Sequence, residues 1–128
     1  MTKNSLEKVG KWAIAILLGL SFIAAGWPKI MPSESMIRRF ENWGYSAEFT
    51  TLIGILELTA GILVLLPKLA AYGSGMIFIL MIGAIYTHLA TGIGSILFAV
   101  IYLLMAACSI ALNWRDTLLI KKLKHKES

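Results

Sequence analysis

The chain has 128 residues, of which 58% are hydrophobic and 15% are charged, and its mean hydropathy is +0.77. Soluble domains are about 45–50% apolar and about 25% charged, so the composition excludes that class and indicates an integral membrane protein. The formal net charge of +5 does not imply nucleic-acid binding, because the basic residues flank hydrophobic runs instead of forming one basic face. The single cysteine, Cys108, excludes an intrachain disulfide and a thiolate metal cluster.

Four apolar runs predict an all-α fold: an integral membrane four-helix bundle that forms a single transmembrane domain over residues 1–128. The first span covers residues 12–27 and is shorter than the roughly 20 residues of a typical span. Lys11 and Lys29 flank it, and both side chains can extend their ammonium groups toward the interfaces. A cleavable signal peptide is the alternative interpretation, and the three spans that follow argue against cleavage.

The connection from Pro28 to Glu48 is the one long loop, and it carries a helical pattern of its own. Ser33 or Ser35 is placed to cap a short helix that ends at Gly44. Its apolar residues recur at a spacing of three to four: Met36, Ile37, Phe40 and Trp43. The pattern predicts a short amphipathic helix that lies in the membrane interface between the first and second spans.

The other spans are predicted at residues 49–66, 69–91 and 96–114. Pro67-Lys68 and the Gly92–Ser95 segment are tight turns, which implies antiparallel neighbours. Residues 115–128 are predicted to form a basic cytoplasmic tail.

Lysine and arginine are distributed unequally between the two sides of the predicted bundle. Nine of the twelve lie on the side of the termini and the Pro67-Lys68 turn, and the other side holds Lys29, Arg38 and Arg39. The protein is therefore predicted to lie in the cell membrane, that is, the plasma or inner membrane. The positive-inside rule places both termini in the cytoplasm and the long loop on the opposite, outer side.

Two ionisable residues, Glu57 and His88, lie inside the predicted spans, where ionisable side chains are costly. Glu57 shares a helical face with Gly54 and Gly61, which lets a neighbouring helix approach and cover the carboxyl group. At a rise of about 1.5 Å per residue, Glu57 lies about 13 Å and His88 about 6 Å below the outer boundary. Antiparallel neighbours could bring these two depths within reach of each other.

We therefore predict an outward-facing polar pocket built from Lys29, Glu57, Thr87 and His88, with Tyr86 nearby. Each residue also has a structural interpretation: Glu57 as a hydrogen bond between helices, His88 in interfacial water, Lys29 as a flanking lysine, and Tyr86 as packing. One carboxylate and one imidazole are too few ligands for a metal site. No sequence pattern indicates a hydrolytic site, so the chain is not expected to be an autonomous enzyme, and its catalytic residues, if any, are unknown.

Four short elements resemble a known family. They are Gly26-Trp27-Pro28-Lys29 as G-x-x-K, Glu57-Leu58 with Gly61 as E-L-x-x-G, Lys68 before Ala70-Ala71, and Ala84 with Thr87-His88 as A-x-x-T-H. In this order, and with four short spans, they resemble the DoxX and DoxX-like membrane proteins over about residues 12–91.

The resemblance implies a compact four-helix membrane bundle whose motif positions are Lys29, Glu57, Thr87 and His88. Some members are linked to quinone-dependent respiratory chemistry, and others belong to membrane assemblies that handle thiol and oxidative stress. With Cys108 alone the chain cannot perform dithiol chemistry by itself, so a redox role would need a partner protein or a bound quinone.

The sequence thus favours an accessory or ligand-binding membrane subunit linked to quinone and redox metabolism or to oxidative-stress handling. Its expected partners are the lipid bilayer and membrane redox proteins, with no nucleic acid, and faces rich in small residues would also suit a homo-oligomer. Two alternatives are a small proton-coupled transporter and a scaffold or assembly factor without catalytic activity. The absence of an acidic residue from the first span argues against a transporter of the small multidrug type.

Overall fold

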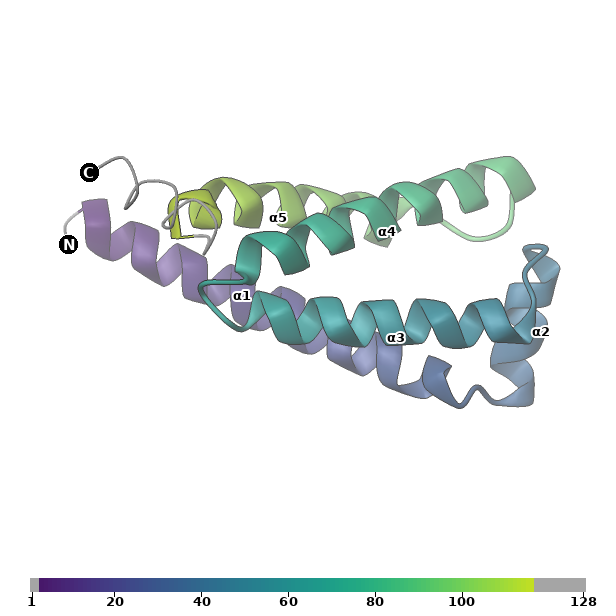
Figure 1. Ribbon diagram of the computed structural model, residues 1–128. Helices are drawn as coiled ribbons and strands as arrows, with labels where there is room; N and C mark the ends of the chain where they lie inside the picture. The colour runs from purple at the N-terminus through teal and green to yellow at the C-terminus, as the bar shows by residue number, and fades with distance from the viewer. Residues whose placement is uncertain (1–2, 117–128) are drawn as a thin grey trace, which may run out of the picture.

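A computed structural model of the protein describes residues 3–116 (Figure 1). Its elements in chain order are α1 (Lys3–Ile30), α2 (Glu34–Asn42), α3 (Ala47–Val64), α4 (Ala70–Thr91), α5 (Leu97–Asn113) and the 3-10 turn η1 (Trp114–Asp116). The predicted all-α class is confirmed: α1, α3, α4 and α5 form a bundle, and the short helix α2 lies across one end (Figure 1). Apart from Arg115 and Asp116, the predicted basic tail lies outside the described residues.

The lengths and composition of the bundle helices are those of membrane spans. The segments Ser5–Ile30, Ala47–Val64 and Ala70–Thr91 are long and apolar enough to cross a bilayer, and α5 is a shorter apolar helix of 17 residues. Seventeen residues are about the lower limit for a span. Large apolar side chains such as Leu17, Leu20 and Leu104 are 56–61% exposed, where lipid would cover them. The protein is a multi-pass membrane protein.

The first helix is longer than the predicted span at both ends. It begins at Lys3 and continues through Pro28 to Ile30. Pro28 lies in the last turn, where its missing N–H removes only the bond to the carbonyl of Ala24, and the helix ends two residues later. Lys29 is therefore a helical residue, and its side chain has a fixed direction. The sequence pattern, in contrast, predicts that Lys29 lies in the loop that begins at Pro28.

Helix α2 is formed by the cap and the spacing that predicted it. Of the two candidate caps the structure uses Ser33, whose Oγ accepts the backbone N–H of Met36 at 3.4 Å. The chain leaves the helix through Gly44, whose φ of +91° is a conformation that favours glycine. Ser46 then caps α3, because its Oγ accepts the N–H of Phe49 at 3.2 Å.

Helices α1 and α3 are in backbone contact through two pairs of glycines, one pair on each helix. A Cβ atom added at Gly26 would lie 2.6 Å from the carbonyl oxygen of Gly54, and one added at Gly61 would lie 2.7 Å from that of Gly19. Ordinary contacts of a Cβ atom begin near 3.4 Å, so side chains larger than hydrogen do not fit here. Small residues let membrane helices approach in this way.

Side-chain contacts join α5 to α4 and to α1. Ser74 on α4 donates a buried hydrogen bond of 2.6 Å to Ser109 on α5, and the rings of Phe22 on α1 and Tyr102 on α5 meet edge to face at 5.3 Å. Toward α2, the α4–α5 pair diverges from the α1–α3 pair (Figure 1).

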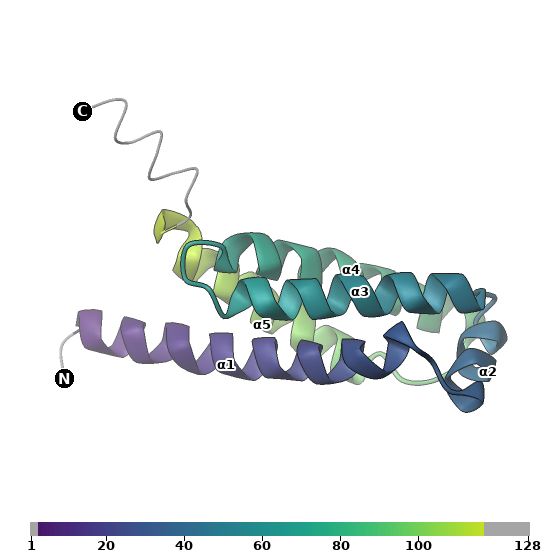
Figure 2. The ribbon, with the colours of Figure 1, turned by 60° about the horizontal axis from the view of Figure 1, so that its bottom comes forward.

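The ends of the bundle differ in what they carry. The start of α1, the α3–α4 turn and the end of α5 lie at one end, whereas α2 and the α4–α5 loop lie at the other (Figures 1 and 2). This arrangement is the one expected for an even number of spans. Which end faces the cytoplasm stays a prediction.

Candidate ligand-binding site

A cavity of about 460 Å³ lies between the two helix pairs at the end that carries α2. This volume is within the roughly 300–1,000 Å³ of small-molecule pockets, which combine an apolar lining with a few placed polar groups. All five helices contribute to its wall. The aromatic residues of the wall are Phe22, Phe40, Trp43, Tyr45, Phe49, Phe98 and Tyr102.

An ion pair between Lys29 and Glu57 forms part of the cavity wall. The Lys29 Nζ donates to both carboxylate oxygens of Glu57, at 2.9 Å and 2.8 Å. The lysine side chain is 18% exposed and the glutamate side chain 7%. Because an ammonium group has three N–H donors, Lys29 retains one after binding Glu57.

The glycine contact between α1 and α3 places this ion pair. A Cβ atom at Gly54 would lie 2.7 Å from the Cβ of Lys29, and a Cβ atom at Gly26 would lie 3.1 Å from that of Glu57. Gly26 and Gly54 therefore lie directly against the two charged residues, one on each helix. The close approach of the backbones brings Lys29 to Glu57.

Thr87 lies in the same wall on α4 and is nearly fully buried. Its hydroxyl donates to the carbonyl of Gly83 at 2.9 Å and is also hydrogen-bonded to the hydroxyl of Tyr45. A threonine hydroxyl has a single hydrogen, so the Tyr45 hydroxyl donates to Thr87. This bond joins the α2–α3 connection to α4 across the end of the cavity.

His88 lies near the rim of the cavity and is half-buried. Its Nδ1 is 2.6 Å from the carbonyl oxygen of Ile93, which accepts the proton of that nitrogen and leaves Nε2 as the second polar atom of the ring. The indole of Trp43 meets the imidazole edge to face at 5.4 Å. Gly94 packs against the ring, because a Cβ atom there would lie 2.8 Å from it.

Comparison with protein families shows that the model of the DoxX-like family matches residues 13–109. The chain belongs to the DoxX-like family. The matched segment includes Lys29, Glu57, Thr87 and His88. Neither the curated proteins nor the solved structures give a significant match.

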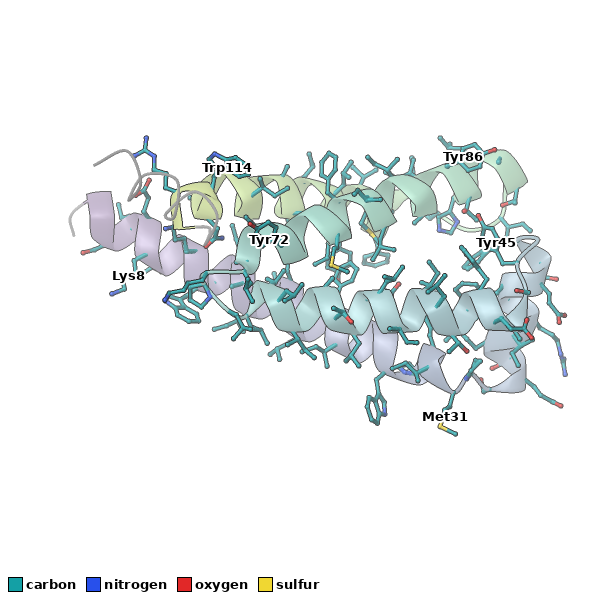
Figure 3. The ribbon with its side chains drawn as sticks, in the orientation of Figure 1. Lys8, Met31, Tyr45, Tyr72, Tyr86 and Trp114 are labelled. Atoms are coloured by element: carbon teal, nitrogen blue, oxygen red, sulfur yellow. The ribbon has the colours of Figure 1, made fainter. Side chains whose placement is uncertain are left out.

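The cavity of this DoxX-like protein brings together four of the five residues predicted from sequence: Lys29, Glu57, Thr87 and His88. Within residues 3–116, however, no hydrogen bond joins Glu57 to His88, and the ion-pair partner of Glu57 is Lys29. Tyr86 is not brought to the cavity: it is 70% exposed and points away from the bundle (Figure 3). Successive helical residues are about 100° apart around the helix axis, so Tyr86 lies on a different face of α4 from Thr87.

The contribution of the long connection to the site is what sequence reasoning missed. Phe40, Trp43 and Tyr45 line the cavity, and Phe40 is buried. The spacing of Phe40 and Trp43 was the available signal, and it was interpreted as contact with the membrane interface. In the structure this apolar face packs against the protein's own bundle, where Phe40 is buried and the ring of Trp43 lies 5.4 Å from that of His88 on α4.

The part of the chain that the structure describes contains no group of three or more His, Cys, Asp or Glu residues suited to holding a metal ion. The polar groups of the cavity are instead hydrogen-bond donors and one paired carboxylate. The arrangement can bind a largely apolar ring and donate hydrogen bonds to its oxygen atoms.

Proposed function

We propose that this DoxX-like protein is an accessory, ligand-binding subunit of the cell membrane that holds a small lipid-soluble ring molecule of the quinone type. One observation carries the proposal: an aromatic-lined cavity of about 460 Å³ has the Lys29–Glu57 ion pair in its wall. Ionisable residues within membrane spans are costly and generally mark functional sites.

The polar groups of the cavity fit the oxygen atoms of a quinone. A quinone ring is flat and apolar and carries carbonyl acceptors at opposite edges, which need donors. Lys29 has one N–H beyond the two bonded to Glu57, and the buried indole N–H of Trp43 in the same wall has no hydrogen-bond partner among the described residues. When bound, a quinone would supply electron and proton transfer, and the ammonium group of Lys29 and the ring of His88 would lie beside it.

The predicted orientation implies on which side of the membrane the cavity lies. If the lysine-rich end lies in the cytoplasm, then α2 and the cavity lie in the outer half of the bilayer. A lipid-soluble ligand would then reach the cavity from the outer leaflet. The ligand, the redox linkage and the partner proteins all belong to this proposal.

The proposal is tested by titrating the purified protein with menadione, a neutral naphthoquinone, in an uncharged detergent. Trp43 lies in the cavity wall, so its fluorescence should be quenched on binding. Lys29→Met should weaken binding about tenfold or more, because hydrogen bonds from charged groups contribute about 1.5–3 kcal/mol. Tyr86→Phe changes an exposed residue next to Thr87 in the sequence, and this variant should bind menadione like the unaltered protein. Absence of saturable binding to the unaltered protein would contradict the proposal.

Two rival functions predict different results for the same protein. A proton-coupled transporter would drive substrate efflux from vesicles under a pH gradient and would lose that activity on Glu57→Gln. A scaffold would co-purify with a stable partner and would be indifferent to Glu57→Gln. The complete pairing of both Glu57 oxygens with Lys29 favours binding over proton-coupled transport, because a freely exchanging carboxylate should not be held by a fixed cation.

A further inference from the structure

The charges of the residues that line the cavity do not sum to zero. Three of them carry a full charge, namely Lys29, Arg39 and Glu57. Lys29 and Glu57 neutralise each other at 2.8 Å, which leaves the positive charge of Arg39. No ion pair recorded within residues 3–116 includes Arg39, whereas its neighbour Arg38 contacts Glu34 at 3.7 Å and does not line the cavity.

The position of Arg39 matters as much as its charge. It lies on α2, the helix across the end of the bundle, together with Met36 and Phe40, which also line the cavity. Lys29 lies on α1, and Phe22 is seven residues, or about 10 Å, further along that helix from it. A ligand with its ring toward Phe22 can therefore direct a polar end toward Lys29 and Arg39.

We propose that the cavity selects anionic ring compounds, those that carry an ionised enolate, phenolate or carboxylate, over neutral rings of the same shape, and excludes cationic ones. This inference rests on the proposed ligand-binding function and names the class of ligand. An anion forms hydrogen bonds with Lys29 and Arg39 in which both partners are charged, whereas the oxygen of a neutral ring offers these donors only a partial charge. A cation meets no uncompensated negative charge in the wall, because Lys29 neutralises Glu57 and Arg39 adds a positive charge.

The selectivity is measured with three naphthoquinones that differ at one ring position. Menadione carries a methyl group and is neutral, lawsone carries a hydroxyl group and is an enolate anion at neutral pH, and the third carries a trimethylammoniomethyl group and is a cation. Titrations use tryptophan quenching in an uncharged detergent. The full chain carries Cys108→Ser so that no quinone can add to its single thiol.

Lawsone should bind about tenfold more tightly than menadione, because its full negative charge interacts with Lys29 and Arg39 more strongly than a neutral carbonyl group does, and the cation should not bind measurably. Arg39→Gln should reduce the preference for lawsone over menadione several-fold. Arg38→Gln is the matched control on the same helix and should leave every affinity unchanged, because Arg38 does not line the cavity.

The outcomes separate this inference from the proposed function. Saturable binding of menadione with equal or weaker binding of lawsone overturns the inference and leaves the binding function standing. A preference for lawsone that survives Arg39→Gln undiminished, or that Arg38→Gln removes equally, also overturns it. Failure of the unaltered protein to bind any of the three compounds contradicts the proposed function itself.

Discussion

Replacing Gly54 by alanine should separate α1 from α3 and disturb the ion pair that the contact between them holds. An added Cβ atom would lie 2.7 Å from the Cβ of Lys29, 2.8 Å from the carbonyl oxygen of Gly26 and 2.9 Å from the backbone nitrogen of Ile30. Two of these neighbours are backbone atoms and the third is the first side-chain atom of Lys29. No rotation of a side chain can therefore relieve the overlap.

The size of the effect follows from these distances. Ordinary contacts begin at 3.4 Å, so the shortfall at Lys29 is about 0.7 Å, and the backbone of α1 has to move by that order. Overpacking of this kind costs about 1–3 kcal/mol of unfolding free energy. The bonds of Lys29 to Glu57, now 2.8 Å and 2.9 Å, would lengthen toward the limit of a hydrogen bond.

The assay is unfolding in mixed micelles with increasing sodium dodecyl sulfate, followed by circular dichroism, together with menadione titration of the folded protein. Gly75→Ala on α4 is the matched control, because an added Cβ atom there meets nothing within 4 Å. Alanine favours helix over glycine by up to about 1 kcal/mol, so the control should be at least as stable as the unaltered protein.

Gly54→Ala should be less stable than the control and should bind menadione more weakly. Equal stability and equal affinity of the two variants would refute the reasoning, because α1 and α3 could then not be in backbone contact at Gly54. Loss of stability without loss of affinity would show that the ion pair does not depend on this contact.

Three further changes test other parts of the site. Lys29→Met should destabilise the protein by up to about 3–5 kcal/mol in the same unfolding assay, because it leaves a buried carboxylate unpaired. Combining Lys29→Met with Glu57→Gln should recover most of this loss of stability. Equal stability of the single and double variants would contradict the pairing. Tyr45→Phe should cost about 0.5–1.5 kcal/mol through the lost bond to Thr87, whereas Tyr86→Phe should cost nothing measurable. A green fluorescent protein fused after the last residue should fluoresce and an alkaline phosphatase fused there should be inactive, because the positive-inside rule places this end in the cytoplasm; the reverse result would place the cavity in the inner half of the bilayer.

The helices were predictable because each has a local signal. Ser33 and Gly44 bound α2 as the sequence indicated, and Gly92, with φ of +69°, ends α4 where the apolar run ends. The end of α1 was not predictable in the same way. Proline usually stops a helix, but Pro28 comes so late in α1 that only its last turn is affected.

Four polar residues of the cavity wall were predictable from the sequence, whereas the pairing of Glu57 with Lys29 was not. Counting residues along a span gives the depth of Glu57 and His88 but not the rotation of one helix against another. Gly54 and Gly61, on the same helical face as Glu57, indicate that a neighbouring helix approaches closely, but they do not indicate which helix it is. The structure uses that face for α1, so the partner of Glu57 is Lys29. Likewise, the apolar face of α2 gives no indication whether lipid or protein covers it, and here Phe40 is buried against the bundle.

The Lys29–Glu57 ion pair in the cavity wall can be measured directly by solid-state NMR of the protein in lipid bilayers, with ¹⁵N at lysine Nζ and ¹³C at glutamate Cδ. We expect a through-space dipolar coupling between Lys29 and Glu57, as required by contacts of 2.8 Å and 2.9 Å from Nζ to the carboxylate oxygens. This coupling should disappear in Lys29→Arg, and the resonances that give rise to it should shift when menadione is added. Absence of any such coupling would show that the two residues are not paired, and a coupling indifferent to menadione would show that the pair does not line the ligand site.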